Sequence, residues 1–375
     1  MAHGGTRRPA NGMTAETVRA PKFAHILDVL KQQIHDGRQA PGTRLPTELE
    51  LTREFQVSRP TAARALNELE RLGLVERLAG SGTYVKASAR GAARLAGAVF
   101  GLLIPGLGNT EIFEPICGRM AACAEATSCT LLWGGCDAGA AGARSAEQLG
   151  RRYVEQRVNG VFFAPLELVP DKDAVNRRII EVLTGAGIPV VLLDRDIAAA
   201  PQRTFHDLVG LDNFQAGFLL ASHLLKQGCS RIDFLAPRFA APTLEERISG
   251  YWTALLRAGI MPSPTWLHHE DPDDHEFAQR LIRSGCRAVI CSNDATAAAF
   301  INALAKLGLS LPSDMKVAGF DDVSYALHLK LTTIRQPCDA IGVVAFDAML
   351  GRLVDPALPP RTIRLSGELI VRASA

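Results

Sequence analysis

Apolar residues recur with helical spacing in two stretches near the beginning of the chain. The first stripe predicts a helix over residues 23–37 and consists of Phe23, Ile26, Leu27, Leu30 and Ile34. The second predicts a helix that Ser58 caps, with Pro60 in its first turn, and consists of Ala62, Ala65, Leu66, Leu69 and Leu72. Between them, Thr47 and Glu50 have the spacing of a capping box, so a further helix is expected from about Glu48 to Phe55.

A β-hairpin is expected directly after the third helix. Residues 74–77 and 83–85 are strand-like, and Gly80, Ser81 and Gly82 lie between them as turn residues. Two helices, a short turn at 56–58, a third helix and a hairpin make the plan of a winged helix-turn-helix. We expect this α+β domain at residues 21–86, after a flexible tail at 1–20.

The rest of the chain alternates continuous apolar runs with amphipathic stretches. The runs are 99–104, 129–133, 158–163, 188–193, 231–235, 288–291 and 316–320. The amphipathic stretches are 114–127, 147–156, 173–186, 213–227, 244–258, 277–284 and 295–307. Alternating β and α elements with strands buried on both faces predict parallel sheets covered by helices. After a small, basic linker at 87–96, residues 97–375 therefore form an α/β domain of two similar lobes with a cleft between them.

Charge is distributed unevenly along the 375 residues, although the net charge is only +2. Residues 1–95 hold 15 Lys and Arg against 9 Asp and Glu, a net charge of +6, so the remainder carries −4. A basic N-terminal module suggests a polyanionic partner for that part alone. A chance excess of solvated charge is the alternative reading.

Several classes of function find no support in the sequence. No apolar run reaches the roughly 20 residues of a membrane span, and residues 1–20 lack the apolar core of a signal peptide. The eight cysteines form no C-x-x-C pair, so we expect reduced thiols in a cytoplasmic protein. No nucleophile elbow, Walker loop or G-x-G-x-x-G is present, which argues against an enzyme and against a bound cofactor. The adjacent His268 and His269 lack the i, i+4 spacing of a helical metal site, so no metal is expected.

Motifs in the first domain resemble the GntR-type winged helix. They occur in the family's order and spacing, and are residues 42–48, 57–61, 65–66 with Leu69, 73–75 and 80–85. The resemblance implies binding of double-stranded operator DNA. Two positions depart from the family, because Leu49 and Ala63 stand where arginine is common, so the base preferences of relatives do not transfer.

A recognition helix presents its N-terminal residues to the major groove, which makes five residues candidate DNA contacts. They are Ser58, Arg59, Pro60, Thr61 and Arg64. Arg59 is expected to contact a guanine or a phosphate, and Arg44 the DNA backbone. The wing tip, Gly80, Ser81 and Gly82, is expected to approach the minor groove closely. The alternative is that these arginines are solvated and that Ser58 and Thr61 only cap the helix.

Residues 97–372 resemble the effector domain of LacI/GalR regulators, which share a fold with periplasmic sugar-binding proteins. The matching segments are 158–161, 188–195, 209–213 with 216–217, 223–225 with Gly228, 247–251, 292–294, 317–322 and 331–337. A GntR-type domain before such an effector domain is the arrangement of arabinose-repressor-type regulators.

The resemblance implies a small-molecule site in the crevice at the carboxyl ends of the strands. Asp194, Arg247 and Asp294 would bind sugar hydroxyls, and Phe113 would stack on a pyranose ring. Asp321 or Asp322 is expected at the edge of the cleft, with Asp322 as the candidate. The alternatives are that the aspartates cap helices or turns and that Phe113 belongs to the core.

The sequence therefore predicts a homodimeric transcription regulator, more in keeping with a repressor than an activator, whose operator affinity responds to a small polar ligand such as a sugar. A purine or another polar metabolite would suit the same fold. A transport receptor fits poorly with the DNA-binding head, and an enzyme fused to such a head fits poorly with the alternating elements. Residues 87–96 lack the pattern of a LacI-type hinge helix, so the coupling between the domains stays open.

Overall fold

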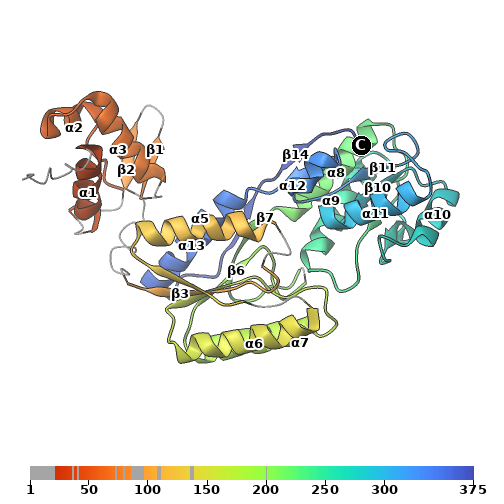
Figure 1. Ribbon diagram of the computed structural model, residues 1–375, viewed down its shortest axis with the longest axis horizontal. Coiled ribbons are helices and arrows are strands. Elements are labelled where there is room, and N and C mark those ends of the chain that lie inside the picture. The colour runs from red at the N-terminus through yellow and green to blue at the C-terminus, as the bar shows by residue number, and fades with distance from the viewer. Residues whose placement is uncertain are drawn as a thin grey trace, which may run out of the picture. The chain divides into compact units, whose positions relative to one another are not determined.

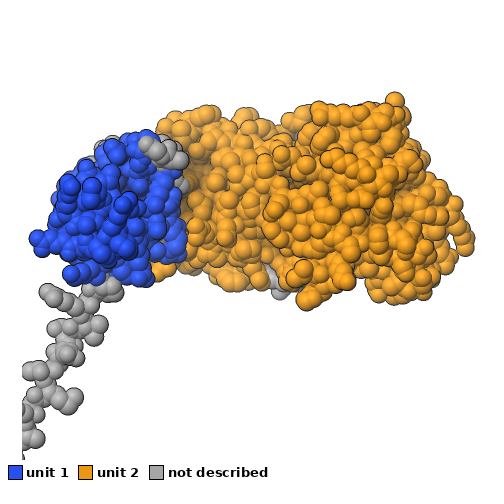
Figure 2. Space-filling model, turned by 90° about the horizontal axis from the view of Figure 1, so that it is seen from above, with its two compact units in different colours: residues 1–90 blue, residues 91–375 orange. Residues whose placement is uncertain are grey.

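The computed structural model describes most of the chain in several stretches. They are residues 22–35, 38–39, 42–71, 74–78, 81–85, 97–107, 111–135, 139–199 and 201–375. The chain divides into two compact units, Met1–Arg90 and Gly91–Ala375, which Figure 2 shows in different colours. The expected tail at 1–20 and the expected linker at 87–96 lie outside the described residues.

The described part of the first unit holds three helices and a two-stranded antiparallel sheet (Figure 1). They are α1 (Lys22–His35), α2 (Glu48–Phe55), α3 (Arg59–Arg71), β1 (Val75–Leu78) and β2 (Gly82–Val85). The predicted capping box starts α2, because Thr47 Oγ1 accepts from Glu50 N at 3.3 Å and Glu50 Oε2 accepts from Thr47 N at 2.6 Å. The winged helix-turn-helix is thus confirmed. Leu72 of the predicted stripe lies outside the described residues.

The helices and strands of this unit enclose one apolar core. The two predicted stripes meet in it, since Ile26 and Leu30 of α1 and Leu66 and Leu69 of α3 are all buried there. Burial of one stripe from each helix against the other is what holds short helices together in water. The core thereby fixes the angle at which the N-terminal end of α3 is presented.

The first lobe of the second unit is built on a six-stranded parallel sheet with the order β13-β7-β6-β5-β3-β4. Its strands are β3 (Val99–Leu103), β4 (Thr130–Trp133), β5 (Gly160–Phe163), β6 (Val190–Leu193), β7 (Asp207–Leu211) and β13 (Thr362–Leu365). Helices α5 (Phe113–Ala126) and α13 (Cys338–Val354) cover one face, and α6 (Gly139–Glu155) and α7 (Lys172–Gly185) cover the other (Figure 1). Strands buried on both faces explain the continuous apolar runs.

The second lobe repeats this plan around a four-stranded parallel sheet with the order β11-β10-β8-β9. Its strands are β8 (Asp233–Leu235), β9 (Leu267–His268), β10 (Ala288–Cys291) and β11 (Lys316–Ala318). Helices α8 (Asn213–Lys226) and α9 (Thr243–Arg257) cover one face, and α10 (His275–Arg283) and α11 (Asp294–Lys306) cover the other. The remaining elements are η1 (Pro264–Trp266), α12 (Ser324–His328), β12 (Thr333–Arg335) and β14 (Glu368–Ile370).

The chain passes between the two lobes three times. It crosses from β7 to α8, from β12 to α13 and from β13 to β14. The two-lobed α/β fold and its parallel sheets are confirmed, but β12 and β14 pair antiparallel, which the sequence did not predict. Because the carboxyl ends of the strands of both sheets point toward the region between the lobes, loops from both lobes meet there.

Candidate functional site

The first unit carries an open groove with three arginines in its lining. The groove lies between the N-terminal ends of α2 and α3 and the hairpin, and Arg44, Arg59 and Arg77 line it. Arg59 is about three-quarters exposed, and its Nε is 3.0 Å from Glu48 Oε2. An exposed ion pair of this kind contributes little, so the guanidinium is free to exchange Glu48 for another anion.

The predicted contact residues lie around this groove in different ways. Ser58 Oγ and Thr61 Oγ1 are 2.8 Å apart at the start of α3, where Pro60 occupies the first turn. The guanidinium of Arg64 instead lies 4.0 Å from the ring centroid of Phe23, against α1. Arg64 is therefore part of the contact between α1 and α3, although it stays exposed.

The hairpin approaches the segment before α2 closely. Arg44 and Tyr84 form an isolated antiparallel β-bridge, and Gly82 has a φ of +138°, a backbone conformation that favours glycine. Ser81 Oγ lies 2.7 Å from Tyr84 Oη, and Gly80 lies outside the described residues. Arg77, on β1, was missed by the sequence reading, although its place on the exposed side of a two-stranded hairpin was a usable signal.

A cleft opens between the lobes of the second unit, at the carboxyl ends of the strands. Its volume is about 60 Å³. Five charged side chains line it, and they are Glu167, Asp194, Arg195, Arg247 and Asp321. Loops after β5, β6, β8 and β10 and the start of α9 supply most of the lining, as expected for this edge of a parallel sheet.

Arg195 is the buried cation on the first-lobe side of the cleft. It is 5% exposed, and its guanidinium forms ion pairs with Glu167 and with Asp194 (Nε to Oδ2, 3.0 Å). Burial alone would raise the pKa of Glu167, but the charge and hydrogen bond of Arg195 outweigh it and hold the pKa low. Asp194 adopts a left-handed conformation (φ +67°), and a Cβ on the neighbouring Gly210 would lie 2.7 Å from Asp194 O.

Arg247 is the corresponding cation on the second-lobe side. Its Nε donates to Asn213 Oδ1 at 2.7 Å, its Nη1 donates to Ser292 O at 2.5 Å, and its guanidinium lies 4.4 Å from the ring centroid of Phe320. The backbone of Arg247 is fixed by close contact of α8 and α9, since a Cβ on Gly217 would lie 2.0 Å from Arg247 O. The cleft thus holds two oriented, planar donor groups.

Two buried acceptors in the lining of the cleft have no hydrogen-bond partner among the described residues. They are Asp194 Oδ1 and Gln336 Oε1. Gln336 Nε2 donates to Asp321 Oδ1 at 2.7 Å, which leaves only its oxygen unsatisfied. Buried polar atoms nearly always have a partner, so unsatisfied atoms at one cleft indicate that a polar ligand or water completes them.

Three predicted ligand residues lie away from this cleft. Phe113 is buried in the core of the first lobe, and Asp294 is fully buried beneath the loops, where Thr333 Oγ1 lies 2.7 Å from its Oδ1 and Val323 N donates to its Oδ2 at 3.1 Å. Asp322 forms ion pairs with Arg335 (2.8 Å) and Arg372 (2.6 Å). Asp294 and Asp322 are thus held by contacts within the protein, and Phe113 packs among apolar side chains.

The sequence analysis named Asp194 and Arg247 and gave Asp321 as one of two alternatives at the cleft edge, but it did not name Glu167, Arg195 or Gln336 as lining residues. Arg195 and Gln336 stand in segments already recognised by resemblance, directly after Asp194 and after β12. The signal that was available is charge at the end of a buried strand. Which of two successive residues faces the cleft depends on the left-handed turn at Asp194, and an ordinary residue pattern does not predict such a turn.

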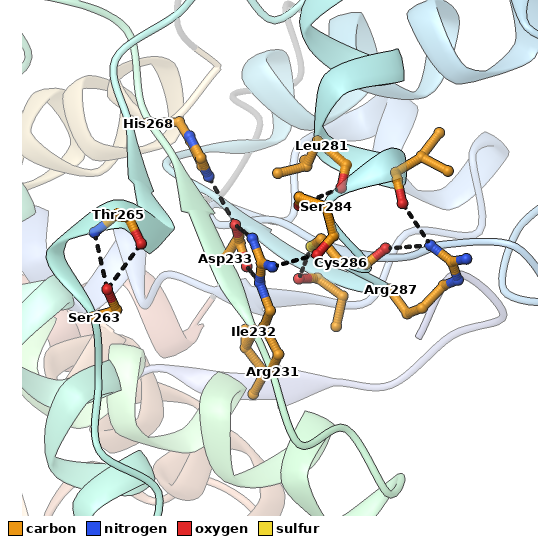
Figure 3. A network of polar contacts seen from close by, with 12 residues as sticks. Arg231, Ile232, Asp233, Ser263, Thr265, His268, Leu281, Ser284, Cys286 and Arg287 are labelled. Atoms are coloured by element: carbon orange, nitrogen blue, oxygen red, sulfur yellow. Dashed lines mark hydrogen bonds and ion pairs between the residues drawn. The ribbon is translucent and has the colours of Figure 1, made fainter.

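Of the two adjacent histidines of the second lobe, His268 belongs to a buried polar network. His268 Nε2 lies 2.8 Å from Asp233 Oδ2, and Arg231 donates to the same carboxylate at 2.7 and 2.9 Å. Figure 3 shows this network. Burial alone would raise the pKa of Asp233, but these hydrogen bonds outweigh it and hold the pKa below its ordinary value. Within the described ranges, no three His, Cys, Asp or Glu side chains gather as a metal site would require. The seven described cysteines are free.

Comparison with known proteins assigns both units. Residues 23–85 match the model of bacterial regulatory proteins of the gntR family, and residues 221–375 match a periplasmic binding protein-like domain. An arabinose metabolism transcriptional repressor of Geobacillus stearothermophilus is 27% identical over 368 residues, 94% of this chain and 95% of that relative. The HTH-type transcriptional repressor PurR of Aliivibrio salmonicida is 25% identical over 60% of this chain and 66% of its own length.

A solved structure gives the same result for the second unit. A LacI family transcriptional regulator from Mycobacterium smegmatis is similar with a TM-score of 0.61 and 26% identity, covering 74% of this chain and 98% of that one. The protein is a transcription regulator and not an enzyme. It is a DNA-binding repressor of the hybrid type, with a GntR helix-turn-helix domain before a LacI-like effector domain. No described helix is long and apolar enough to span a membrane.

Proposed function

We propose that this repressor is a cytoplasmic homodimer whose operator affinity changes when a sugar binds in the cleft of its effector domain. The observation that carries the proposal is the pair of buried, unsatisfied acceptors, Asp194 Oδ1 and Gln336 Oε1, in a cleft that also holds Arg195 and Arg247. Acceptors beside planar donors match the vicinal hydroxyls of a sugar, each of which donates one hydrogen bond and accepts others.

A sugar fits the lining better than a purine does. The described lining of the cleft contains no aromatic side chain, whereas a flat base is best held by stacking on one. The apolar part of the lining consists of small or aliphatic residues such as Ile112, Ala240 and Leu244. These suit the C–H face of a sugar ring. The arabinose-related name of the long relative from Geobacillus stearothermophilus agrees with this choice.

On the DNA side, we assign the groove of the first unit to the operator. The N-terminal end of α3, with Ser58, Arg59, Pro60 and Thr61, would enter the major groove, and Arg64 would flank it. Arg44 and Arg77 would contact phosphates, and the tip Gly80, Ser81 and Gly82 would approach the minor groove. A dimer would present two such surfaces to a palindromic site.

Ligand and operator would be coupled through the closure of the lobes. Polar contacts join the lobes at separate places. Ser324 donates through N (2.6 Å) and Oγ (2.9 Å) to Glu111, Arg364 donates to Glu246 at 2.6 Å, and Leu168 N donates to Phe239 O at 2.8 Å. A ligand that favours one degree of closure would shift the population of head spacings in the dimer. The operator must then change the affinity for the ligand by the same factor.

Selection of bound fragments from genomic DNA by the full-length protein, without and with sugars, tests this proposal. We expect enrichment of a short palindrome and a change in its binding with one sugar. Arg59→Ala should weaken binding about tenfold or more, whereas Arg53→Ala, an equally charged change on exposed α2 surface outside the groove, should weaken it much less. A folded protein that enriches no sequence under any condition would contradict the proposal.

A further inference from the structure

A second cavity lies beside the cleft and shares Asp194 and Thr243 with it. We call it the lateral cavity. Its volume is about 410 Å³, against about 60 Å³ for the cleft. The cleft has room for about four water molecules, so a sugar ring would enter it only with a wider separation of the lobes. The lateral cavity, by contrast, falls within the range of roughly 300–1,000 Å³ found for ligand sites.

Both lobes build the lateral cavity. The first lobe supplies the loop after β6, with Asp196 and Arg203, and the edge of the sheet at β7 and β13. The second lobe supplies the starts of α8 and α9, with Asn213 and Glu246. A molecule bound there would therefore contact both lobes and depend on their separation, just as one in the cleft would.

The charges of the lateral cavity are largely neutralised within the protein. Asp196 accepts from the backbone N of Ile197 (2.7 Å), Ala198 (3.2 Å) and Thr204 (3.1 Å), and Glu246 is paired with Arg364 at 2.6 Å. No excess of positive charge is left for an anionic ligand, because three carboxylates face two guanidinium groups in the lining.

The rest of the lining combines polar and aliphatic groups. Gln202, Asn213, Thr243 and Thr362 offer neutral hydrogen-bonding groups. The aliphatic part consists of Ala198, Pro201, Leu208, Leu211, Pro242 and Ile363. Hydroxyl groups and C–H faces together are the surface of an uncharged sugar, and this lining is complementary to both.

Asp194 joins the two spaces. Its side chain is 6% exposed, it belongs to both linings, and its Oδ1 has no hydrogen-bond partner among the described residues. We propose that the cleft and the lateral cavity are one elongated site, and that the effector is an uncharged sugar of at least two rings. One ring lies at Arg195 and Arg247, the next lies in the lateral cavity, and Asp194 accepts from a hydroxyl between them. This inference rests on the proposed sugar response.

Calorimetric titration of the full-length protein tests the inference. The probes are glucose, galactose, xylose and arabinose, together with maltose, cellobiose, lactose, melibiose, xylobiose and arabinobiose. We expect one disaccharide to bind at least about tenfold more tightly than either of its component monosaccharides. Ala198→Phe should fill the lateral cavity and remove this advantage. The control is Ala357→Phe, since Ala357 N donates to Asp355 Oδ1 in the same kind of turn as Ala198 N to Asp196 Oδ1 but lies outside both cavities.

The possible outcomes separate the inference from the proposed function. Monosaccharides that bind as tightly as every disaccharide would overturn the two-ring site and leave the sugar response intact. Unchanged disaccharide binding by Ala198→Phe would overturn the assignment of the lateral cavity. No binding of any of these sugars by the wild-type protein would contradict both. The thermal unfolding temperatures of both variants should lie within a few degrees of the wild-type value. This control shows whether a loss of binding is caused by unfolding.

Discussion

The two ends of the parallel strands treat buried carboxylates differently. At the amino ends, Asp207 opens β7 and Asp233 opens β8, and both side chains are fully buried. Asp207 is bound by Arg352 (3.0 Å) and Arg361 (3.1 Å), and Asp233 by Arg231 and His268. At the carboxyl ends Asp322 is likewise bound by Arg335 and Arg372, but Asp194 keeps one oxygen unsatisfied.

The pKa shifts separate Asp207 from Asp294 and Asp321 in the same way, although Arg195 also holds the pKa of Glu167 low at the carboxyl ends. Burial raises the pKa of Asp207, but hydrogen bonds from Arg361 and Arg352 outweigh it and lower the pKa. At the other end, burial first and then the charge of Asp321 raise the pKa of Asp294 to about 8, and burial also raises the pKa of Asp321. The carboxylates of Asp207 and Asp233 are neutralised by cations of the protein, whereas in our proposal a bound ligand would complete the unsatisfied groups at the cleft.

The largest effect should come from breaking a completed network at the amino end. Asp207→Ala leaves Arg352 and Arg361 without their shared carboxylate in a buried site, so the free energy of unfolding should fall by about 3–5 kcal/mol. Denaturant unfolding at pH 7 measures this. Folding lowers the pKa of Asp207, so this carboxylate stabilises the protein above its ordinary pKa, and the stabilisation is lost as the pH falls through the lowered pKa. The difference in the free energy of unfolding between wild type and variant should therefore shrink in acid.

Asp173→Ala is the matched control in the same lobe. Asp173 is 62% exposed and pairs with Lys172 at the surface, so its loss should cost less than about 1 kcal/mol. Equal destabilisation by the two changes would mean that the buried network of Asp207 stabilises the protein no more than an exposed ion pair does. The contrast between the two ends of the strands would then be lost.

Local patterns predicted the elements well where one residue pair or one stripe decides the structure. The capping box of Thr47 and Glu50 fixed the start of α2, and buried runs identified the central strands. Helix α13 was missed because it is apolar on most sides, with Ile341, Ala345 and Met349 buried, and therefore shows little amphipathic periodicity. The short strands β12 and β14, three residues each, pair across 33 positions of sequence and give almost no local signal.

The lining residues of the cleft were harder to predict because their positions depend on tertiary contacts. Asp194 and Arg247 were predicted near the cleft and do line it, since each lies in a segment after a strand that ends there. Asp294 also follows such a strand, but its Oδ1 bonds Thr333, 39 positions away, and its side chain is buried below the cleft. A residue that follows a strand can be placed at the edge of the sheet from the sequence alone. The direction of its side chain depends on how the loops pack in the folded protein.

A pH-dependent effect of intermediate size should come from Asp294. Its raised pKa means that the folded state holds the proton up to about pH 8, so its stabilising contribution is complete below about pH 4 and is lost as the pH rises toward 8. Asp294→Asn resembles the protonated carboxyl group but does not titrate, so the stability of this variant should not fall in the same way as the pH rises. Relative to wild type, the free energy of unfolding of the variant in denaturant should rise by about 2 kcal/mol between pH 5 and pH 6.5, and further toward pH 8.

Asp339→Asn, at an exposed position in the first turn of α13, serves as the control and should show no such pH dependence. If Asp294→Asn and wild type kept a constant difference from pH 5 to pH 8, Asp294 would be ionised like its counterparts at the amino ends. The division between the two ends of the sheets would then not extend to its pKa.

The smallest effect, and the most specific one, is expected from Asp194→Ala. Removing this carboxylate leaves Arg195 paired with Glu167, so no buried cation loses its last partner and stability should change by less than about 1 kcal/mol. Affinity for the sugar found in the titrations should fall about tenfold, because the ligand loses an acceptor that no protein group otherwise uses. Asp173→Ala should leave that affinity unchanged. Should Asp194→Ala instead destabilise the protein as strongly as Asp207→Ala while retaining the sugar, the carboxylates at the cleft would be structural like those at the amino ends, and the unsatisfied oxygen would have no functional meaning.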